Sequence, residues 1–294
     1  MATAFPVDYI EPVFRPPSEA NSLIIPVTNG CSWNQCTFCE MYTQPQKRFR
    51  ARDEAVVLDE IRRCGEQLLV QRVFLADGDA LVLPTHRLLK ILRAISEHLP
   101  QVNRVSSYCL PRNLRKKSVE ELKELADAGL RMVYVGAESG DDEVLARVNK
   151  GETFASTLEK LGAAGMTRSV MILNGLGGKS LSQQHAENSA RLMNAAQPEF
   201  LSTLVVSFPG GDARLRQNFA DFEPLDQQSL FIEVERLLQA LELNDTTFRS
   251  DHASNYLVLK GQLGADKAAL LEQVRRAIEQ PRFAGLRQEW QRGL

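Results

Sequence analysis

Residues 23–42 read LIIPVTNGCSWNQCTFCEMY, a short apolar run that leads directly into a loop with three cysteines. The run Leu23–Val27 is typical of a buried strand. The thiols that follow stand at Cys31, Cys36 and Cys39, with the spacing C-x4-C-x2-C. Three thiolates on one short loop can wrap a cuboidal [4Fe–4S] cluster and leave one iron without a protein ligand. A structural zinc site needs a fourth ligand, so zinc, or buried thiols without a metal, stay open as alternatives.

The two remaining cysteines do not extend this motif. Cys64 falls in a helical pattern and Cys109 at the end of an apolar run, and neither has ligand-pair spacing to the loop. We expect Cys64 to be a buried small side chain. Cys109 follows a strand end that can face the cavity, so a role there stays open beside the structural role that we favour. An odd number of cysteines, three of them crowded together, favours metal binding in the cytoplasm over a secreted disulfide scaffold.

The composition is that of an ordinary globular protein. The chain has 294 residues, of which 44% are hydrophobic and 24% charged, enough for two domains or one barrel with an appendage. Lys and Arg total 35 and Asp and Glu 37, so no positive excess points to nucleic acid or an anionic membrane. No apolar run is long enough for a membrane helix, and no secretory signal is present. We therefore expect a cytoplasmic protein that binds neither membranes nor nucleic acid.

Apolar runs suited to buried strands alternate with helical patterns. The expected strands are Leu23–Val27, Val73–Ala76, Arg104–Tyr108, Met132–Gly136, Ser169–Leu173 and Leu201–Ser207. The expected helices are Asp53–Leu69, Thr85–His98, Ser118–Ala128, Asp141–Ala164 with a break near Gly151, Leu181–Ala195 and Asp226–Leu241. Repeated strand–helix units predict an α/β fold with a parallel sheet, either open or closed into a barrel. In both cases the functional loops belong at the carboxyl ends of the strands.

The pattern divides the chain into three parts. Residues 1–21 hold four prolines and no apolar periodicity, so we expect an extended arm that lies on the body. Residues 22–243 form the repeating core. Residues 244–294 form a C-terminal extension, in which the irregular stretch NDTTFRSDHASNYLVLKG leads into a helix at Asp266–Glu279.

The cysteine loop after a first strand, followed by strand–helix units, resembles the radical SAM superfamily. The resemblance implies that Cys31, Cys36 and Cys39 bind a [4Fe–4S] cluster, whose open iron S-adenosylmethionine (SAM) chelates through its amino and carboxylate groups. The usual spacing is C-x3-C-x2-C, and this loop has one residue more. Phe38 matches a position that packs near the adenine of SAM.

Three further motifs carry the resemblance, which covers residues 20–240. FLADGDA, residues 74–80, resembles the Gly-Gly-Glu element and implies that Gly78 and Asp79 meet the amino group of SAM. VGAESGDDEVLARVNKG, residues 135–151, resembles a signature of the branch that contains oxygen-independent coproporphyrinogen oxidases, methylthiotransferases and the elongator catalytic subunit. It implies that Glu138 binds the ribose hydroxyls, with Ser139 beside it. SVMILNGLGGKS, residues 169–180, resembles the element that lines the adenine, here Ile172 to Gly175.

The resemblance implies a six-stranded, partly open parallel β/α barrel, with a C-terminal helical extension that covers the cavity. It also implies a radical SAM enzyme. An electron donor such as flavodoxin or ferredoxin reduces the cluster, SAM is cleaved to methionine and a 5′-deoxyadenosyl radical, and the radical abstracts hydrogen from a substrate that we expect to be a small molecule. Since only two cysteines lie outside the loop, the auxiliary cluster of methylthiotransferases is not expected. Neither a cobalamin-binding nor an acetyltransferase domain is expected.

Other interpretations remain open for the same residues. Asp77 and Asp79 can simply cap the following helix, and Glu138 and Asp141 can support a helix N-terminus. The glycines at 175–178 fit a tight turn better than a phosphate-binding loop. The chain as a whole can also be an Fe–S carrier or sensor that does not use SAM, or a zinc-stabilised binding module. The Gly78–Asp79 element and Glu138 argue against a carrier, which needs neither.

The segment FRSDHASNY, residues 248–256, concentrates polar side chains on a connection after the sixth helix. Functional residues are often found on loops that a rigid scaffold supports, so we expect this segment to close over the cavity mouth. Arg249 can pair with a substrate carboxylate, His252 can move a proton, and Asn255 can anchor a polar edge. The alternative is that these side chains bond one another and the barrel rim.

Overall fold

The computed structural model describes residues 5–292, and their contacts divide into two compact units. Among the described residues, the first unit contains 5–34, 39–135 and 160–168, and the second contains 35–38, 136–159 and 169–292. The described helices include none that is long and apolar enough to cross a membrane.

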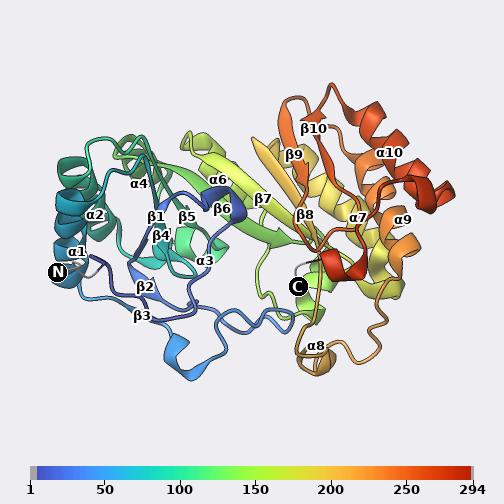
Figure 1. The fold of residues 1–294 in the computed structure, drawn as a ribbon, viewed down its shortest axis with the longest axis horizontal. Helices are drawn as coiled ribbons and strands as arrows, with labels where there is room; N and C mark the ends of the chain where they lie inside the picture. The colour runs from blue at the N-terminus through green and yellow to red at the C-terminus, as the bar shows by residue number, and fades with distance from the viewer. Residues whose placement is uncertain (1–4, 293–294) are drawn as a thin grey trace. The chain divides into compact units, whose positions relative to one another are not determined.

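The first unit combines the first three parallel strands with their helices (Figure 1). Its elements are β1 (Leu23–Pro26), β2 (Thr28–Asn29), β3 (Arg50–Ala51), α1 (Glu54–Gln67), β4 (Arg72–Ala76), α2 (Thr85–His98), β5 (Arg104–Tyr108), α3 (Pro111–Leu114) and α4 (Val119–Asp127). β1 pairs with β4 and β4 with β5, all parallel. Val73 to Ala76 are fully buried, as expected for a parallel strand covered on both faces.

Three elements have residues in both units, and the rest of the chain belongs to the second. The shared elements are β6 (Leu130–Glu138), α6 (Ala155–Ala163) and β7 (Thr167–Asn174). The second unit adds α5 (Asp142–Arg147), α7 (Gly178–Ala196), β8 (Phe200–Val205), α8 (Ala213–Arg216), α9 (Gln227–Ala240), β9 (Thr246–Ser250), β10 (Leu259–Leu263) and α10 (Lys267–Glu279). In this unit α9 packs against both α7 and α10 (Figure 1).

The main sheet has the strand order β1-β4-β5-β6-β7-β8-β9-β10, with β1 and β10 as its edge strands. The six predicted strands correspond to β1 and β4 to β8, so the predicted α/β fold with a parallel, unclosed sheet is confirmed. The predicted helices are confirmed as well, including the break between α5 and α6. Ser118 caps α4 by accepting from the Glu121 N–H, in the predicted capping box.

The prediction that the C-terminal extension is helical, with an irregular start, is wrong in part. The extension contains β9, which continues the sheet in parallel with β8, and β10, which pairs antiparallel with β9. Thr246, Phe248 and Ser250 of β9 are buried in alternation. Two of these buried positions are polar, so the period-two pattern of a strand is weak in the sequence.

The N-terminal arm contacts the first unit through hydrogen bonds. The Tyr9 hydroxyl donates to the Ile24 carbonyl over 2.9 Å, and the Asp8 N–H donates to Glu60 Oε1 over 3.1 Å. Lys47 Nζ donates to the Ile10 carbonyl over 2.8 Å. The last two bonds give the backbone of the arm partners that a proline-rich segment cannot supply by itself.

Candidate functional site

In the first unit, the loop between β4 and α2 holds the beginning of the cysteine loop. The Gly78 N–H donates to the Gly30 carbonyl over 3.1 Å. A Cβ atom on Gly78 would lie 2.9 Å from Cys31 Cα and Cβ, so only glycine allows this approach. The glycine of the predicted SAM element therefore has a packing reason in this structure, directly against the first cysteine.

Asp79 is engaged with the same loop. Its Oδ1 accepts from the Ser32 N–H over 3.1 Å, and its Oδ2 accepts from the Ser32 hydroxyl and from Asn113 Nδ2. Its side chain makes no capping bond to the short helix at Ala80–Val82, so the alternative role as a helix cap is not seen. Burial raises the pKa of Asp79, against the opposing effect of these donors.

A buried ion pair supports the backbone on the other side of this loop. Lys47 Nζ lies 2.5 Å from Asp77 Oδ2, and both side chains are 1% exposed. The same oxygen accepts from the Gly30 N–H over 3.0 Å. The sequence alone gave no signal for Lys47, because its partner lies thirty residues away. The pair ties residue 30, which precedes Cys31, to the end of β4.

The three loop cysteines are partly exposed thiols, and none of the five cysteines, all within residues 5–292, forms a disulfide. Burial and the nearby Asp79 carboxylate raise the pKa of Cys31, while the N–H groups of Asn34 and Trp33 act to lower it. Backbone donors of this kind favour the thiolate form of a cysteine. The described residues hold no group of three or more His, Cys, Asp or Glu placed to bind a single metal ion.

Cys64 and Cys109 are buried, at 0% and 1% exposure. Cys64 lies on α1, and the Cys109 N–H donates to the Tyr134 carbonyl just after β5. The prediction that Cys64 is a buried small side chain is confirmed.

In the second unit, the end of β6 presents a carboxylate in an unusual way. Glu138 has a φ of 65°, a left-handed conformation that is rare for a residue with a side chain. Its Oε1 bonds Lys150 Nζ over 3.0 Å, whereas its Oε2 is buried and accepts no hydrogen bond from the described residues. A Cβ atom on Gly136 would lie 2.3 Å from Glu138 Oε1, so this glycine makes room for the carboxylate.

Lys150 is a residue that the motif contained but to which the sequence gave no role. Besides pairing with Glu138, its ammonium lies 5.7 Å from the centroids of the Phe38 and Phe154 rings. Phe38 in turn packs against a buried apolar cluster of the second unit. The Thr37 N–H donates to the Val148 carbonyl over 2.9 Å, which holds the segment that contains Cys36 and Phe38.

The alternative that Glu138 supports a helix N-terminus is not what the structure shows. That position belongs to Asp141, which caps α5 by accepting from the Val144 N–H over 2.9 Å. Ser139 is fully buried and shares a 2.8 Å hydrogen bond with His185. His185 is thus a core histidine with a hydrogen-bond partner.

The element expected to line the adenine is formed by the end of β7 and the turn before α7. Ile172 is fully buried in β7, and Gly175 has a φ of 84°. The Gly175 N–H donates to Glu233 Oε1 over 2.6 Å. α7 begins at Gly178, so the tight-turn interpretation of the glycine run is correct.

The substrate-side residues predicted in the C-terminal extension make mostly local contacts. Asn255 Nδ2 donates to the Thr203 carbonyl over 2.8 Å, and His252 Nδ1 shares a 2.9 Å bond with the Ser254 hydroxyl. Burial and the Arg287 cation lower the pKa of His252. Arg249 is exposed on β9. These contacts favour the interpretation in which the segment bonds itself and the edge of the sheet.

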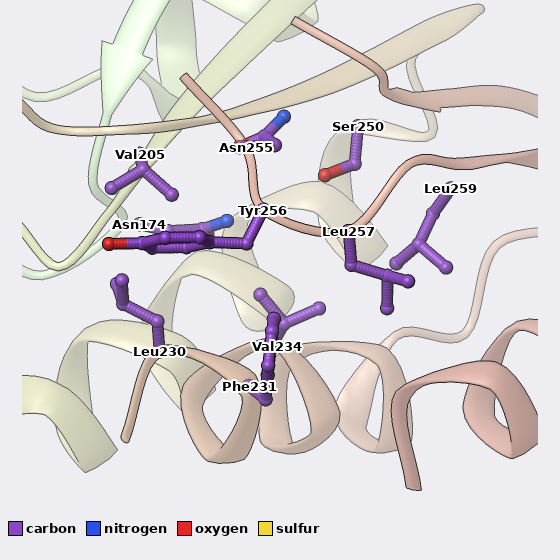
Figure 2. Close-up of a pocket in the computed structure, with 10 residues that line it drawn as sticks. All are labelled: Asn174, Val205, Leu230, Phe231, Val234, Ser250, Asn255, Tyr256, Leu257 and Leu259. Atoms are coloured by element: carbon purple, nitrogen blue, oxygen red, sulfur yellow. The ribbon is translucent and has the colours of Figure 1, made fainter. Parts of the chain in front are cut away.

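Asn255 and Tyr256 also line a small cavity between the strands and α9 (Figure 2). Leu230, Phe231 and Val234 of α9 form its opposite wall. Its volume is about 20 Å³, room for about one water molecule. This cavity is too small for an organic substrate.

A family model for the radical SAM superfamily matches residues 25–193, more than half of the chain, and the chain belongs to this superfamily. Its members use a [4Fe–4S] cluster and SAM. The match includes the cysteine loop, residues 74–80 and residues 135–151.

Individual relatives are distant. The heme chaperone HemW of Bacillus subtilis is 24% identical over 180 residues, which are 58% of this chain and 47% of that protein. Coproporphyrinogen III oxidase (HemN) from Escherichia coli has a TM-score of 0.53 at 17% identity, covering 74% of this chain and 50% of that one. The cobalamin-binding methyltransferase TsrM from Kitasatospora setae has a TM-score of 0.50 at 23% identity, covering 62% and 34%. The chain spans between a fifth and a half of the curated relatives it matches.

Proposed function

We propose that this chain binds a [4Fe–4S] cluster through Cys31, Cys36 and Cys39, cleaves SAM reductively, and removes a hydrogen atom from a small-molecule substrate. The observation that carries the proposal is the three-cysteine loop within the region that matches the superfamily. The cluster and SAM together supply a 5′-deoxyadenosyl radical when both are bound and an electron is provided by a donor such as flavodoxin or ferredoxin. The protein supplies binding, orientation and the exclusion of water.

Two groups of residues hold SAM in this proposal. Gly78 and Asp79 meet its amino group, on the side of the cysteine loop. Glu138 accepts hydrogen bonds from the ribose hydroxyls, with Ser139 beside it. The buried Oε2 of Glu138 supports this role, because a buried acceptor without a donor is costly unless a ligand provides one.

The adenine side is supplied by the end of β7. Ile172 and Gly175 line the base, and the Phe38 ring packs near it. Gly175 has no side chain, which allows a flat aromatic base to approach the backbone. The Phe38 ring, fixed by its apolar cluster and by the Lys150 cation, provides a rigid wall.

The substrate-side role of Arg249, His252 and Asn255 remains a proposal with its own test. Arg249 is the member of this group that is exposed, so it is available to pair with a substrate carboxylate. Arg249→Ala and His252→Ala are expected to keep the iron and the cleavage of SAM but to lose turnover of the substrate. If both variants instead melt early or lose iron, the segment is structural.

The proposed function is tested by anaerobic reconstitution with iron and sulfide, followed by reduction and quantification of 5′-deoxyadenosine from added SAM. We expect four irons per chain, a brown protein and reductant-dependent cleavage. The triple variant, with Cys31, Cys36 and Cys39 all replaced by Ala, is the matched control and should show none of these three results. A colourless protein with one tightly bound zinc would refute the proposal, and a brown protein that never binds or cleaves SAM would indicate an Fe–S carrier.

A further inference from the structure

A chain of buried polar side chains runs from α9 through α7 to the end of β6 within the second unit. Glu233 Oε1 lies 3.9 Å from His185 Nε2, and His185 Nδ1 shares a 2.8 Å hydrogen bond with Ser139 Oγ. Ser139 is 0% exposed, and His185 and Glu233 are each 1% exposed. All three side chains are thus shielded from bulk solvent.

Such groups are expensive in a protein interior. A buried carboxylate is tolerated only when donors surround it, and here the Gly175 N–H and the Ser182 hydroxyl each donate to Glu233 over 2.6 Å. Burial nevertheless raises the pKa of Glu233. An apolar residue would pack between α7 and α9 at a lower cost, so the polar chain calls for a reason beyond packing.

Both ends of this chain of contacts touch residues assigned above to the nucleoside half of SAM. At one end Ser139 directly follows Glu138, whose left-handed backbone presents the carboxylate. At the other end Glu233 binds the N–H of Gly175. We propose that His185 and Glu233 are positioning residues for the nucleoside of SAM. His185 holds the ribose segment at residues 138–139 and Glu233 holds the adenine turn at Gly175, each through a hydrogen bond, and the two side chains lie in polar contact with each other.

The Nδ1 side of the imidazole is the side that meets Ser139. Ser139 Oγ accepts from the Asp141 N–H over 3.0 Å and shares the 2.8 Å hydrogen bond with His185 Nδ1. His185 Nε2 faces Glu233 instead. The contact at Nδ1 is therefore the one that fixes Ser139.

This assignment gives a pair of substitutions that differ in one contact. His185→Asn places an amide near the position of Nδ1 and retains a partner for Ser139. His185→Gln places its amide near the position of Nε2 and leaves Ser139 without it. Both residues are polar and similar in size to histidine, so both variants are expected to fold.

The measurement is the affinity of each reconstituted protein for 5′-deoxyadenosine, which reports on nucleoside contacts without turnover. Iron content and thermal stability are measured in the same samples. We expect His185→Asn to bind nearly as the parent does and His185→Gln to bind about tenfold more weakly, which corresponds to about one lost hydrogen bond. Iron content should be unchanged in both.

A second variant on α7 separates positioning from stability. Asn194 lies near the C-terminal end of α7, after His185 in the sequence. Its Nδ2 donates to the Ala240 carbonyl, and its Oδ1 accepts from the Glu242 N–H. Asn194→Ala is expected to melt earlier than the parent while its nucleoside affinity stays the same. Glu233→Ala removes the acceptor for the Gly175 N–H and should bind the nucleoside about tenfold more weakly, whereas Glu233→Gln keeps an acceptor and is its matched conservative variant.

The inference rests on the proposed function, and the two fail in different ways. If the parent takes up no iron and binds no nucleoside, both are wrong. If the parent binds the nucleoside and the Asn and Gln variants of His185 bind it equally well, the positioning role is wrong and the proposed function stands. If affinity follows melting temperature through all variants, including Asn194→Ala, the chain of contacts is only structural.

Discussion

Asp79 in the first unit and Glu138 in the second each belong to a motif expected to bind SAM, but their carboxylates make different contacts. Both oxygens of Asp79 are occupied by donors from Ser32 and Asn113. Glu138 has one oxygen paired with Lys150 and a second that no described residue contacts by a hydrogen bond. Asp79 therefore has its contacts in the cysteine loop, whereas Glu138 has an oxygen left over for the ligand in the proposed function.

The backbone supports the same distinction. The left-handed conformation of a residue other than glycine costs about 1–2 kcal/mol, and Glu138 adopts it between a buried strand and a helix cap. Strain of this kind is tolerated where it presents a functional group. Asp79 has a negative φ of −165°, an extended conformation without such a cost.

The largest effect is expected at the cysteine loop, because loss of one thiolate removes a cluster ligand outright. Cys36→Ala should lose iron and SAM cleavage together. Cys64→Ala is the control, since Cys64 is a fully buried thiol on α1, and it should retain both while melting earlier. Iron content and 5′-deoxyadenosine yield provide the measurement. Full iron content in Cys36→Ala would show that Cys36 is not a cluster ligand.

Glu138→Gln tests the ligand-facing carboxylate. Loss of a charged acceptor costs about 1.5–3 kcal/mol, so SAM affinity should fall on the order of 10–100-fold. Iron content should stay at the parent level, because Glu138 contacts Lys150 rather than the cysteine loop. The measurement is a SAM titration followed by the cluster spectrum. Unchanged SAM affinity together with lost iron would show that Glu138 supports the cluster rather than SAM.

For Asp79→Asn in the first unit, in contrast to Glu138→Gln, we expect an effect on iron content. The substitution weakens the bonds to Ser32, which is adjacent to Cys31, so we expect reduced iron content after reconstitution. The remaining cluster-containing molecules should bind SAM more weakly as well, through the proposed contact with its amino group. Should Asp79→Asn assemble the cluster fully, the carboxylate is not needed to hold the loop.

A smaller effect is expected at Lys150. Lys150→Met keeps the length of the side chain and its contact with Phe38 but removes the charge that pairs with Glu138. Breaking such a buried pair leaves one charge unbalanced, and the SAM affinity should fall about tenfold. The same titration measures it. If affinity does not change while Glu138→Gln weakens it, Lys150 is not required to orient the carboxylate.

The smallest effect concerns the helix that follows Glu138. Burial acts to raise the pKa of Asp141, but the hydrogen bonds from Val144, Asn188 and Gln184 prevail and lower it. Because the folded-state pKa is depressed, the stabilisation is present above the unfolded pKa and is lost as the pH falls through the folded pKa. Asp141→Ala should reduce the free energy of unfolding by about 1 kcal/mol at neutral pH. Thermal melts should show a parent–variant gap that narrows below about pH 4, and a gap that widens there would contradict the cause given.

The sequence predicted the core architecture because each strand and helix of the core has a local pattern that can be recognised along the chain. The apolar runs and capping signals located the six strands and the helices of the core. β9 was missed because Thr246 and Ser250 are polar at buried positions, and only the pairing with β8 makes them a strand. Tertiary pairing overrode the local signal there.

The candidate site was predictable only where its residues lie in compact motifs. The cysteines, Gly78, Asp79 and Glu138 stand in short patterns that can be recognised in one chain. Lys47, His185 and Glu233 could not be found this way, because each meets its partner across thirty or more residues of sequence. Their signal is burial of a charged or polar side chain, which exists only in the folded structure.

The most direct test of the central claim is the electron paramagnetic resonance spectrum of the reconstituted, dithionite-reduced protein with and without SAM. The account predicts a reduced [4Fe–4S] signal whose shape changes when SAM is added. It also predicts that Glu138→Gln shows the same initial signal but needs more SAM for the change. A protein without an iron–sulfur signal, or with a signal that SAM never alters, would contradict the account.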